Sequence, residues 1–255
     1  MMDTQNPPET GSGGVFQTFA VKALAARTLR SYFESPAAYV TLFVFYLLTG
    51  YLFAAPLFLV KAASLRGLID FVPLLLAFLV PAMTMGLLAE ELRSGTFETL
   101  ATLPLEDWDI VLGKYLGFSA LHLICVAGLL FYVLVLRLCA SNAGLDWGEM
   151  FGTLLGLALT GLTFGAIGLF ASSLGKNQVV SFVTAFLVCF VLFILGKMAG
   201  LLPGGLGAVA EYLGLDSHVE NLAKGVLDSR DLVYFASLTF AFLYLTVQRL
   251  QTRRF

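Results

Sequence analysis

The chain has 255 residues, of which 58% are hydrophobic and only 13% are charged. Soluble domains contain roughly 25% charged residues, so the composition excludes a soluble globule and indicates a polytopic membrane protein. The 15 basic and 17 acidic residues leave a net charge of −2 and no basic surface for nucleic acid. The three cysteines lack a CxxC spacing, which argues against a disulfide framework and against a zinc site.

The N-terminal region divides into a tail and a helix. Residues 1–14 are rich in Pro, Gly, Ser and Thr and are predicted to form a disordered tail. Residues 15–35 interleave apolar residues with Lys22, Arg27 and Arg30, a spacing that predicts an amphipathic helix at the cytoplasmic membrane surface. A solvated helix of a soluble surface is the alternative interpretation.

The rest of the chain contains six runs that are almost free of charge, and each is long enough for a membrane-spanning helix, which needs about 20 apolar residues. We therefore predict an all-α fold in which residues 15–255 form a single transmembrane domain. The six spans cover residues 37–60, 71–89, 112–137, 150–175, 177–200 and 232–249.

Six spans place both termini on the same side of the membrane. That side carries nine Lys and Arg residues and the opposite side carries six, which favours cytoplasmic termini under the positive-inside rule. Between the fifth and sixth spans, residues 208–215 and 219–227 are expected to form two short helices. They are too short to span a bilayer and are predicted to be interfacial or re-entrant.

The sequence provides no recognisable catalytic site, metal site or cofactor site. Gly-Lys pairs occur at 113–114, 175–176 and 196–197, but none has the other residues of a phosphate-binding GxxxxGK[ST] loop, and GxSxG and HExxH are absent. His122 lies inside the third span, where a neutral hydrogen bond to a neighbouring helix is the simplest interpretation. An intramembrane enzyme that uses His122 or His218 is an alternative hypothesis.

Glycines and prolines indicate how the spans pack. Small residues at a four-residue spacing allow membrane helices to approach closely, either within the chain or between subunits. The fourth span carries such a row: Gly152, Gly156, Gly161, Gly165 and Gly168. Pro56 in the first span and Pro73 and Pro81 in the second predict kinks.

The segment between the second and third spans is the most informative, because six of the 17 acidic residues lie between Glu90 and Asp109. Its middle predicts a short helix closed by Pro104, with Phe97, Leu100 and Leu103 on one face. The acids at 106, 107 and 109 fall in the first turn of the next helix, where they complement the helix dipole. A charged, partly apolar helix on the cytoplasmic side suits docking into a soluble partner.

Residues 90–114 read E-E-x-R-S-G-T-x-E-x-L-x-T-x-P-L-x-D-W-x-I-V-L-G-K. This pattern resembles the loop between the second and third spans of ABC transporter permeases of the type-2 exporter (ABC-2) class, and most closely that of the GldF-like, gliding-motility-associated group. Further matches lie at residues 32–40, 145–148, 167–178 and 225–235, so the resemblance covers nearly all of the chain after about residue 15.

The resemblance implies a permease subunit of an ATP-driven exporter in the bacterial inner membrane, with the ATPase activity on a separate, GldA-like chain. It also implies a second membrane subunit, which is a copy of this chain or a GldG-like protein. A non-transporting membrane anchor of an ATPase machine is the alternative. The residues that would couple the ATPase to the membrane helices are Glu90, Glu91, Arg93, Ser94, Gly95, Thr96, Phe97, Glu98, Leu100, Leu103 and Pro104.

Overall fold

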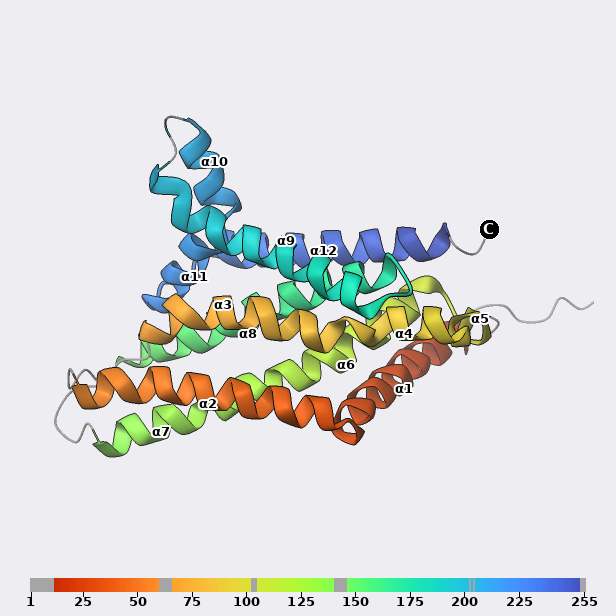
Figure 1. Ribbon diagram of the computed structural model, residues 1–255, viewed down its shortest axis with the longest axis horizontal. Coiled ribbons are helices and arrows are strands. Elements are labelled where there is room, and N and C mark those ends of the chain that lie inside the picture. Colours follow the sequence, from red (N-terminus) through yellow and green to blue (C-terminus); the bar gives the residue numbers. More distant parts are fainter. Residues whose placement is uncertain are drawn as a thin grey trace, which may run out of the picture.

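The computed structural model describes residues 12–59, 66–101, 105–139, 146–201, 203 and 205–252. This part of the chain is helical throughout and contains no strand (Figure 1). The helices are α1 (Ser12–Glu34), α2 (Pro36–Leu59), α3 (Arg66–Thr84), α4 (Gly86–Ser94), α5 (Thr96–Ala101), α6 (Asp107–Gly128), α7 (Leu130–Cys139), α8 (Trp147–Ser173), α9 (Gln178–Met198), α10 (Gly205–Leu213), α11 (Leu215–Ala223) and α12 (Ser229–Gln251).

Six helical stretches in the described residues are long and apolar enough to cross a membrane, which confirms the predicted all-α, six-span fold. They are Ala38–Ala55, Leu68–Ser94, Asp107–Leu138, Trp147–Ser173, Gln178–Leu201 and Ser229–Gln251. The chain is therefore a multi-pass membrane protein. Figure 1 shows α1, α4, α5 and the C-terminal end of α12 at one end of the bundle, and α10 and α11 at the other end.

Helix α8 lies at the centre of the bundle. Two thirds of its span is buried inside the protein (67%), whereas the spans in α2 and α9 are only 22% buried and form the periphery. Helices α3, α6, α9, α11 and α12 all pack against α8. A helix that is apolar on all sides and surrounded in this way is typical of a membrane bundle core.

Several helices begin earlier than the charge-free runs predict, because a capping residue precedes the apolar residues. The side chain of Asp146 accepts hydrogen bonds from the amides of Gly148 and Glu149 at the start of α8. Asp228 caps α12 in the same way, whereas α9 begins at Gln178, directly after its cap Asn177 and within one residue of the predicted start. These side chains satisfy amides that have no partner within the helix, so the helices extend past charged residues that we took as their limits.

The third span is divided between α6 and α7 by an inserted tyrosine. In a regular α-helix, the amide of Leu129 would donate to the carbonyl of Cys125. Here it donates to the carbonyl of Val126, and the Cys125 carbonyl accepts from the hydroxyl of Tyr46 (2.9 Å). Gly128 makes room for this side chain, since a Cβ there would overlap the Tyr46 hydroxyl. A side chain in the hydrogen-bond ladder is a known cause of helix kinks.

The connection between the last two spans contains two short helices, as predicted, but their positions differ from the expected 208–215 and 219–227. Helix α11 ends at Ala223 because Gly225 adopts a left-handed conformation (φ 77°). The amide of Val226 then donates to the carbonyl of Asn221, which closes the helix in a Schellman motif. The expected second helix ran through this glycine.

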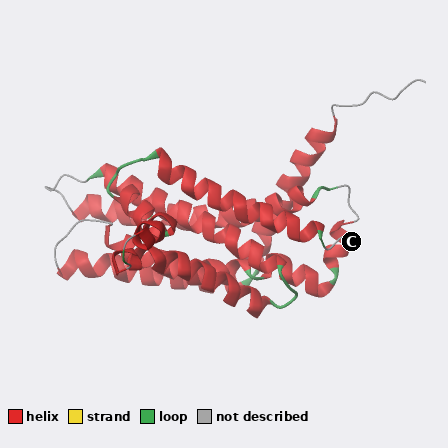
Figure 2. Ribbon diagram, turned by 90° about the horizontal axis from the view of Figure 1, so that it is seen from above, coloured by secondary structure: helices red, strands yellow, loops and turns green. Residues whose placement is uncertain are grey.

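Helix α1 begins at Ser12 and leaves the bundle at an angle (Figure 2), and residues 1–11 of the predicted tail lie outside the described residues. Its largest contact with the bundle is a crossing over α6. A Cβ at Gly113 would lie 2.6 Å from Leu24, and a Cβ at Gly117 would lie 2.6 Å from Thr28. These two glycines also have a four-residue spacing, but the packing predicted from the sequence included only the glycines of the fourth span.

The glycine row on α8 faces other helices of the same chain. A Cβ at Gly161 or Gly165 would overlap the His122 or Phe118 ring of α6, and one at Gly168 would overlap the Thr84 hydroxyl of α3. At the other end of α8, a Cβ at Gly152 would overlap the carbonyl oxygen of Leu222 in α11, whereas one at Gly156 would lie 3.5 Å from Val219, an ordinary contact.

We therefore expect Gly152→Ala to destabilise the protein by about 1–3 kcal/mol, because a backbone carbonyl cannot rotate away from the added methyl group. Gly156→Ala is the matched control on the same helix and should be neutral or slightly stabilising, since alanine is the better helix former. Thermal unfolding of both purified variants in detergent measures the difference. Equal midpoints would contradict the close packing of α8 against α11.

Candidate functional site

Two short helices follow α3: α4 completes the second span, and α5 begins the connection to the third span. The chain turns at Met85 between α3 and α4, and again at Gly95, whose φ of 75° is left-handed and ends α4. Helix α5 then covers Thr96–Ala101, which agrees with a short helix in this segment. Leu103 and Pro104 lie outside the described residues, as does the side chain of Leu100.

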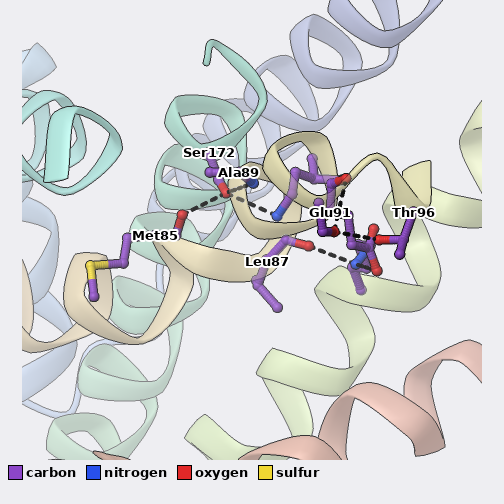
Figure 3. A network of polar contacts seen from close by, with 9 residues as sticks. Met85, Leu87, Ala89, Glu91, Thr96 and Ser172 are labelled. Atoms are coloured by element: carbon purple, nitrogen blue, oxygen red, sulfur yellow. Dashed lines mark hydrogen bonds and ion pairs between the residues drawn. The ribbon is translucent and has the colours of Figure 1, made fainter. Parts of the chain in front are cut away.

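Ser172 of α8 holds the break between α3 and α4 (Figure 3). Its hydroxyl donates to the carbonyl oxygen of Met85 (2.8 Å) and accepts from the amides of Leu88 and Ala89 (2.9 Å each). In a regular helix, those two amides would bond to the carbonyls of residues 84 and 85. One buried hydroxyl therefore replaces the missing helix bonds and ties α4 to the central helix of the bundle.

Lys114 of α6 holds the other side of α4. Its ammonium group lies 2.7 Å from Oε1 of Glu91 and 2.6 Å from the carbonyl oxygen of Leu87. The lysine side chain is only 6% exposed and that of Glu91 is 22% exposed, so the pair is largely desolvated. Glu91 is thus committed to an internal ion pair. Lys114 is the last residue of the motif at 90–114, but no local sequence pattern indicated that its side chain would contact α4.

The remaining residues of the segment divide into an inward and an outward set. Phe97 is buried among Leu88, Leu92, Val111 and other apolar side chains, so it anchors α5 and is not available to a partner. The outward set is polar and consists of Glu90, Arg93, Ser94, Gly95, Thr96 and Glu98. The hydroxyls of Ser94 and Thr96 lie 2.8 Å apart and brace the turn at Gly95 (Figure 3).

The acidic residues at the start of α6 have the structural role predicted for a helix N-terminus. Glu106 and Asp109 form a capping box, in which each side chain accepts from the backbone amide of the other. Glu106 also accepts from the side chain of Gln17 in α1 (3.2 Å). These acids therefore fix the first turn of α6 and connect it to α1.

Both histidines have structural partners. Nε2 of His122 lies 3.4 Å from the carbonyl oxygen of Leu157 in α8, which agrees with the expected hydrogen bond to a neighbouring helix. His218 of α11 lies 2.6 Å from Asp231 of α12 and 3.1 Å from the Tyr212 carbonyl. Within the described residues, no three His, Cys, Asp or Glu side chains gather as a metal site requires.

The Ser172 contacts predict a specific local effect. Ser172→Ala leaves two buried amides of α4 without an acceptor, at a cost of about 1–3 kcal/mol each, and it should speed amide exchange at Leu88 and Ala89. Ser173→Ala is the matched control, because the Ser173 hydroxyl bonds only within α8, to Phe170. Hydrogen exchange followed by mass spectrometry checks this, and unchanged protection of α4 in the Ser172 variant would contradict the contact.

The Lys114–Glu91 pair predicts a non-additive effect. Glu91→Gln leaves a buried ammonium group without its counter-ion and should destabilise the protein by about 3–5 kcal/mol. Adding Lys114→Met to this variant should restore most of the stability, because no unpaired charge then remains. The exposed pair of Arg30 and Glu34 is the control, and Glu34→Gln should cost no more than about 0.5 kcal/mol. Additive effects of the two substitutions in denaturation experiments would argue against a coupled pair.

Comparison with known proteins gives one match. The family model described as "ABC-2 family transporter protein" matches residues 57–222, which is more than half of the chain. The matched region runs from the end of α2 to α11 and includes the whole α4–α5 segment with Lys114 and Ser172. No curated protein matches the chain.

Proposed function

Because the chain belongs to the ABC-2 family of transporter proteins, we propose that it is the permease subunit of an ATP-driven exporter, in which a separate ATPase subunit drives substrate movement across the bacterial inner membrane. The observation that carries this proposal is the construction of the α4–α5 segment. It presents a polar outer face, while its inner face is fixed to the two neighbouring spans by Ser172 and Lys114.

This construction suits the transmission of movement. In the proposed mechanism, the ATPase binds the outward face around Arg93 and Glu98, and its closure on ATP displaces α5. Phe97 carries the displacement into the bundle, and α4 carries it to α8 and α6 through Ser172 and Lys114. For ATP binding to drive such a change, the ATPase must bind the two conformations of the permease with different affinities.

The remaining partners follow from the resemblance to the GldF-like group. We propose a GldA-like ATPase on the cytoplasmic side, where both termini would also lie, and a second membrane subunit that is either a copy of this chain or a GldG-like protein. A role in a gliding-motility-type complex belongs to the same proposal. Stimulation of ATP hydrolysis by substrate in liposomes would separate an exporter from a non-transporting anchor.

The docking role is tested by charge reversal on the outward face. Glu98→Arg should lower the affinity for the ATPase about fivefold, which corresponds to about 1 kcal/mol for one exposed contact. Glu98 has no part in the Ser172 or Lys114 contacts, so the fold of the permease should be unaffected. Co-purification and titration of the ATPase measure the affinity.

The control is Glu211→Arg, which changes another exposed acid, on α10 at the opposite end of the bundle, and it should leave ATPase binding unchanged. If both variants bind the ATPase like the natural protein, the outward face of α5 is not the docking site. If both bind it more weakly, net charge and not a local contact is responsible.

A further inference from the structure

A cleft of about 590 Å³ lies beside the α4–α5 segment. Its walls come from α1, the start of α2, the α3–α4 junction, the first turn of α5, one residue of α6 and the first residue of α9. The volume falls within the range of about 300–1,000 Å³ that is typical of small-molecule sites. Met85, Leu87, Glu91 and Thr96, which Figure 3 shows around the break in the second span, all line it.

The cleft lies where the membrane spans end. Three of its lining residues are themselves span limits: Ala38 begins the first span, Ser94 ends the second and Gln178 begins the fifth. Span ends coincide with the zone of lipid head groups, which lies outside the hydrocarbon core. We therefore expect a ligand in this cleft to have its polar part at head-group depth.

The lining contains four charged residues, and two of them form an ion pair with each other. Lys114 and Glu91 neutralise each other. Arg27 and Glu90 are exposed, and both act electrostatically on Lys114, but neither forms an ion pair that is seen within the described part of the chain. One guanidinium group and one carboxylate thus remain for a ligand.

The rest of the lining is divided between hydroxyls and apolar side chains. Ser31 and Ser35 contribute hydroxyl groups, and Leu24, Ala38 and Met83 contribute apolar surface. The hydroxyl of Tyr32 donates to the carbonyl of Met83, and burial raises the pKa of this phenol above its usual value. The lining therefore suits an amphiphile with a polar head and an apolar tail.

We propose that this cleft binds a phospholipid whose head group carries both a phosphate and a primary ammonium, the phosphatidylethanolamine type. The Arg27 guanidinium matches the phosphate with paired N–H donors, and the Glu90 carboxylate accepts from the ammonium. A choline head group has no N–H to donate, and a glycerol head group places no positive charge beside Glu90. Both lipids should therefore bind more weakly.

Binding at this site has a consequence for coupling that rests on the proposed function. Glu90 and Glu91 belong to α4, and Thr96 begins α5, so a lipid in the cleft contacts the segment that would receive the ATPase movement. Occupancy would then favour one position of α4–α5 and alter the rate of ATP hydrolysis. The lipid site itself does not require this link, because it is formed by this chain alone.

The experiment is lipid binding to the purified full-length chain, measured by native mass spectrometry with phosphatidylethanolamine, phosphatidylcholine and phosphatidylglycerol of the same acyl chains. We expect the ethanolamine lipid to bind most tightly. Arg27→Gln should weaken all three lipids, the ethanolamine lipid by about tenfold. Glu90→Gln should abolish the preference for ethanolamine over glycerol while binding of the phosphatidylglycerol is retained or improved.

Matched controls lie close at hand. Arg30→Gln removes an arginine from α1 that pairs with Glu34 and is not part of the cleft, and Glu211→Gln removes a distant exposed acid. Both should bind the three lipids like the natural chain. If Arg27→Gln proves unstable, Arg27→Lys keeps the charge without the paired donors and should give an intermediate loss.

Equal binding of the three lipids, or unchanged selectivity in both cleft variants, would overturn the proposal. So would tight binding of soluble glycerophosphoethanolamine, because the site would then recognise a free head group and not a lipid. Loss of ATPase docking in the Glu98 variant leaves this binding test unaffected, so the failure of the permease function and the failure of the lipid site are distinguishable.

Discussion

The structure depends on one constraint, which is that backbone amides and carbonyls inside a membrane bundle must find partners without water. The constraint is most severe where a span is interrupted, because several groups lose their helix bonds together. At Met85, the hydroxyl group of Ser172 in α8 forms hydrogen bonds with one carbonyl and two amides. At Leu129 the hydroxyl of Tyr46 has the corresponding role for Cys125. Interruptions of the spans are therefore stabilised by specific side chains of neighbouring helices.

The glycines of α8 make this arrangement possible. Gly168 lies one turn before Ser172, and it faces Thr84, the last residue of α3. A larger side chain at 168 would hold α8 away from α3, and the Ser172 hydroxyl would then be out of reach of α4. The hydrogen bonds of Ser172 to α4 therefore depend on the close contact between α8 and α3 at Gly168. The same relation holds on α6, where Gly113 admits α1 directly beside Lys114.

The sequence predicted those features that depend on local composition or on the preference of a single residue for one position in a helix. Charge-free runs predicted the six spans, and Asp107 and Asp109 lie in the first turn of α6 as predicted, whereas Glu106 is its N-cap residue. The misplaced boundary of α11 shows the limit of this approach. Gly225 ends that helix because it adopts a left-handed conformation, and an apolar pattern on both sides gave no sign of it.

The contacts that build the candidate site could not be predicted, because they join residues distant in sequence. Ser172 is 83 positions from Ala89, and a serine in an apolar helix can as readily bond to its own backbone, as its neighbour Ser173 does. Likewise, Lys114 is separated from Leu87 by 27 positions and lies in an otherwise apolar span. Family resemblance marked the α4–α5 segment as important, but only the fold shows which of its residues face inward.

This division between inward and outward residues determines how the segment can work. Because α4 is bonded to α8 on one side and to α6 on the other, it cannot move without breaking buried polar contacts or moving those helices with it. Broken contacts of this kind are costly inside a protein, so the less costly response to a force on α5 is a joint movement of α4 with the central helix. In the proposed coupling, a force on the short helix α5 would thereby reach the centre of the bundle, although α5 is itself too small to have a stable fold alone.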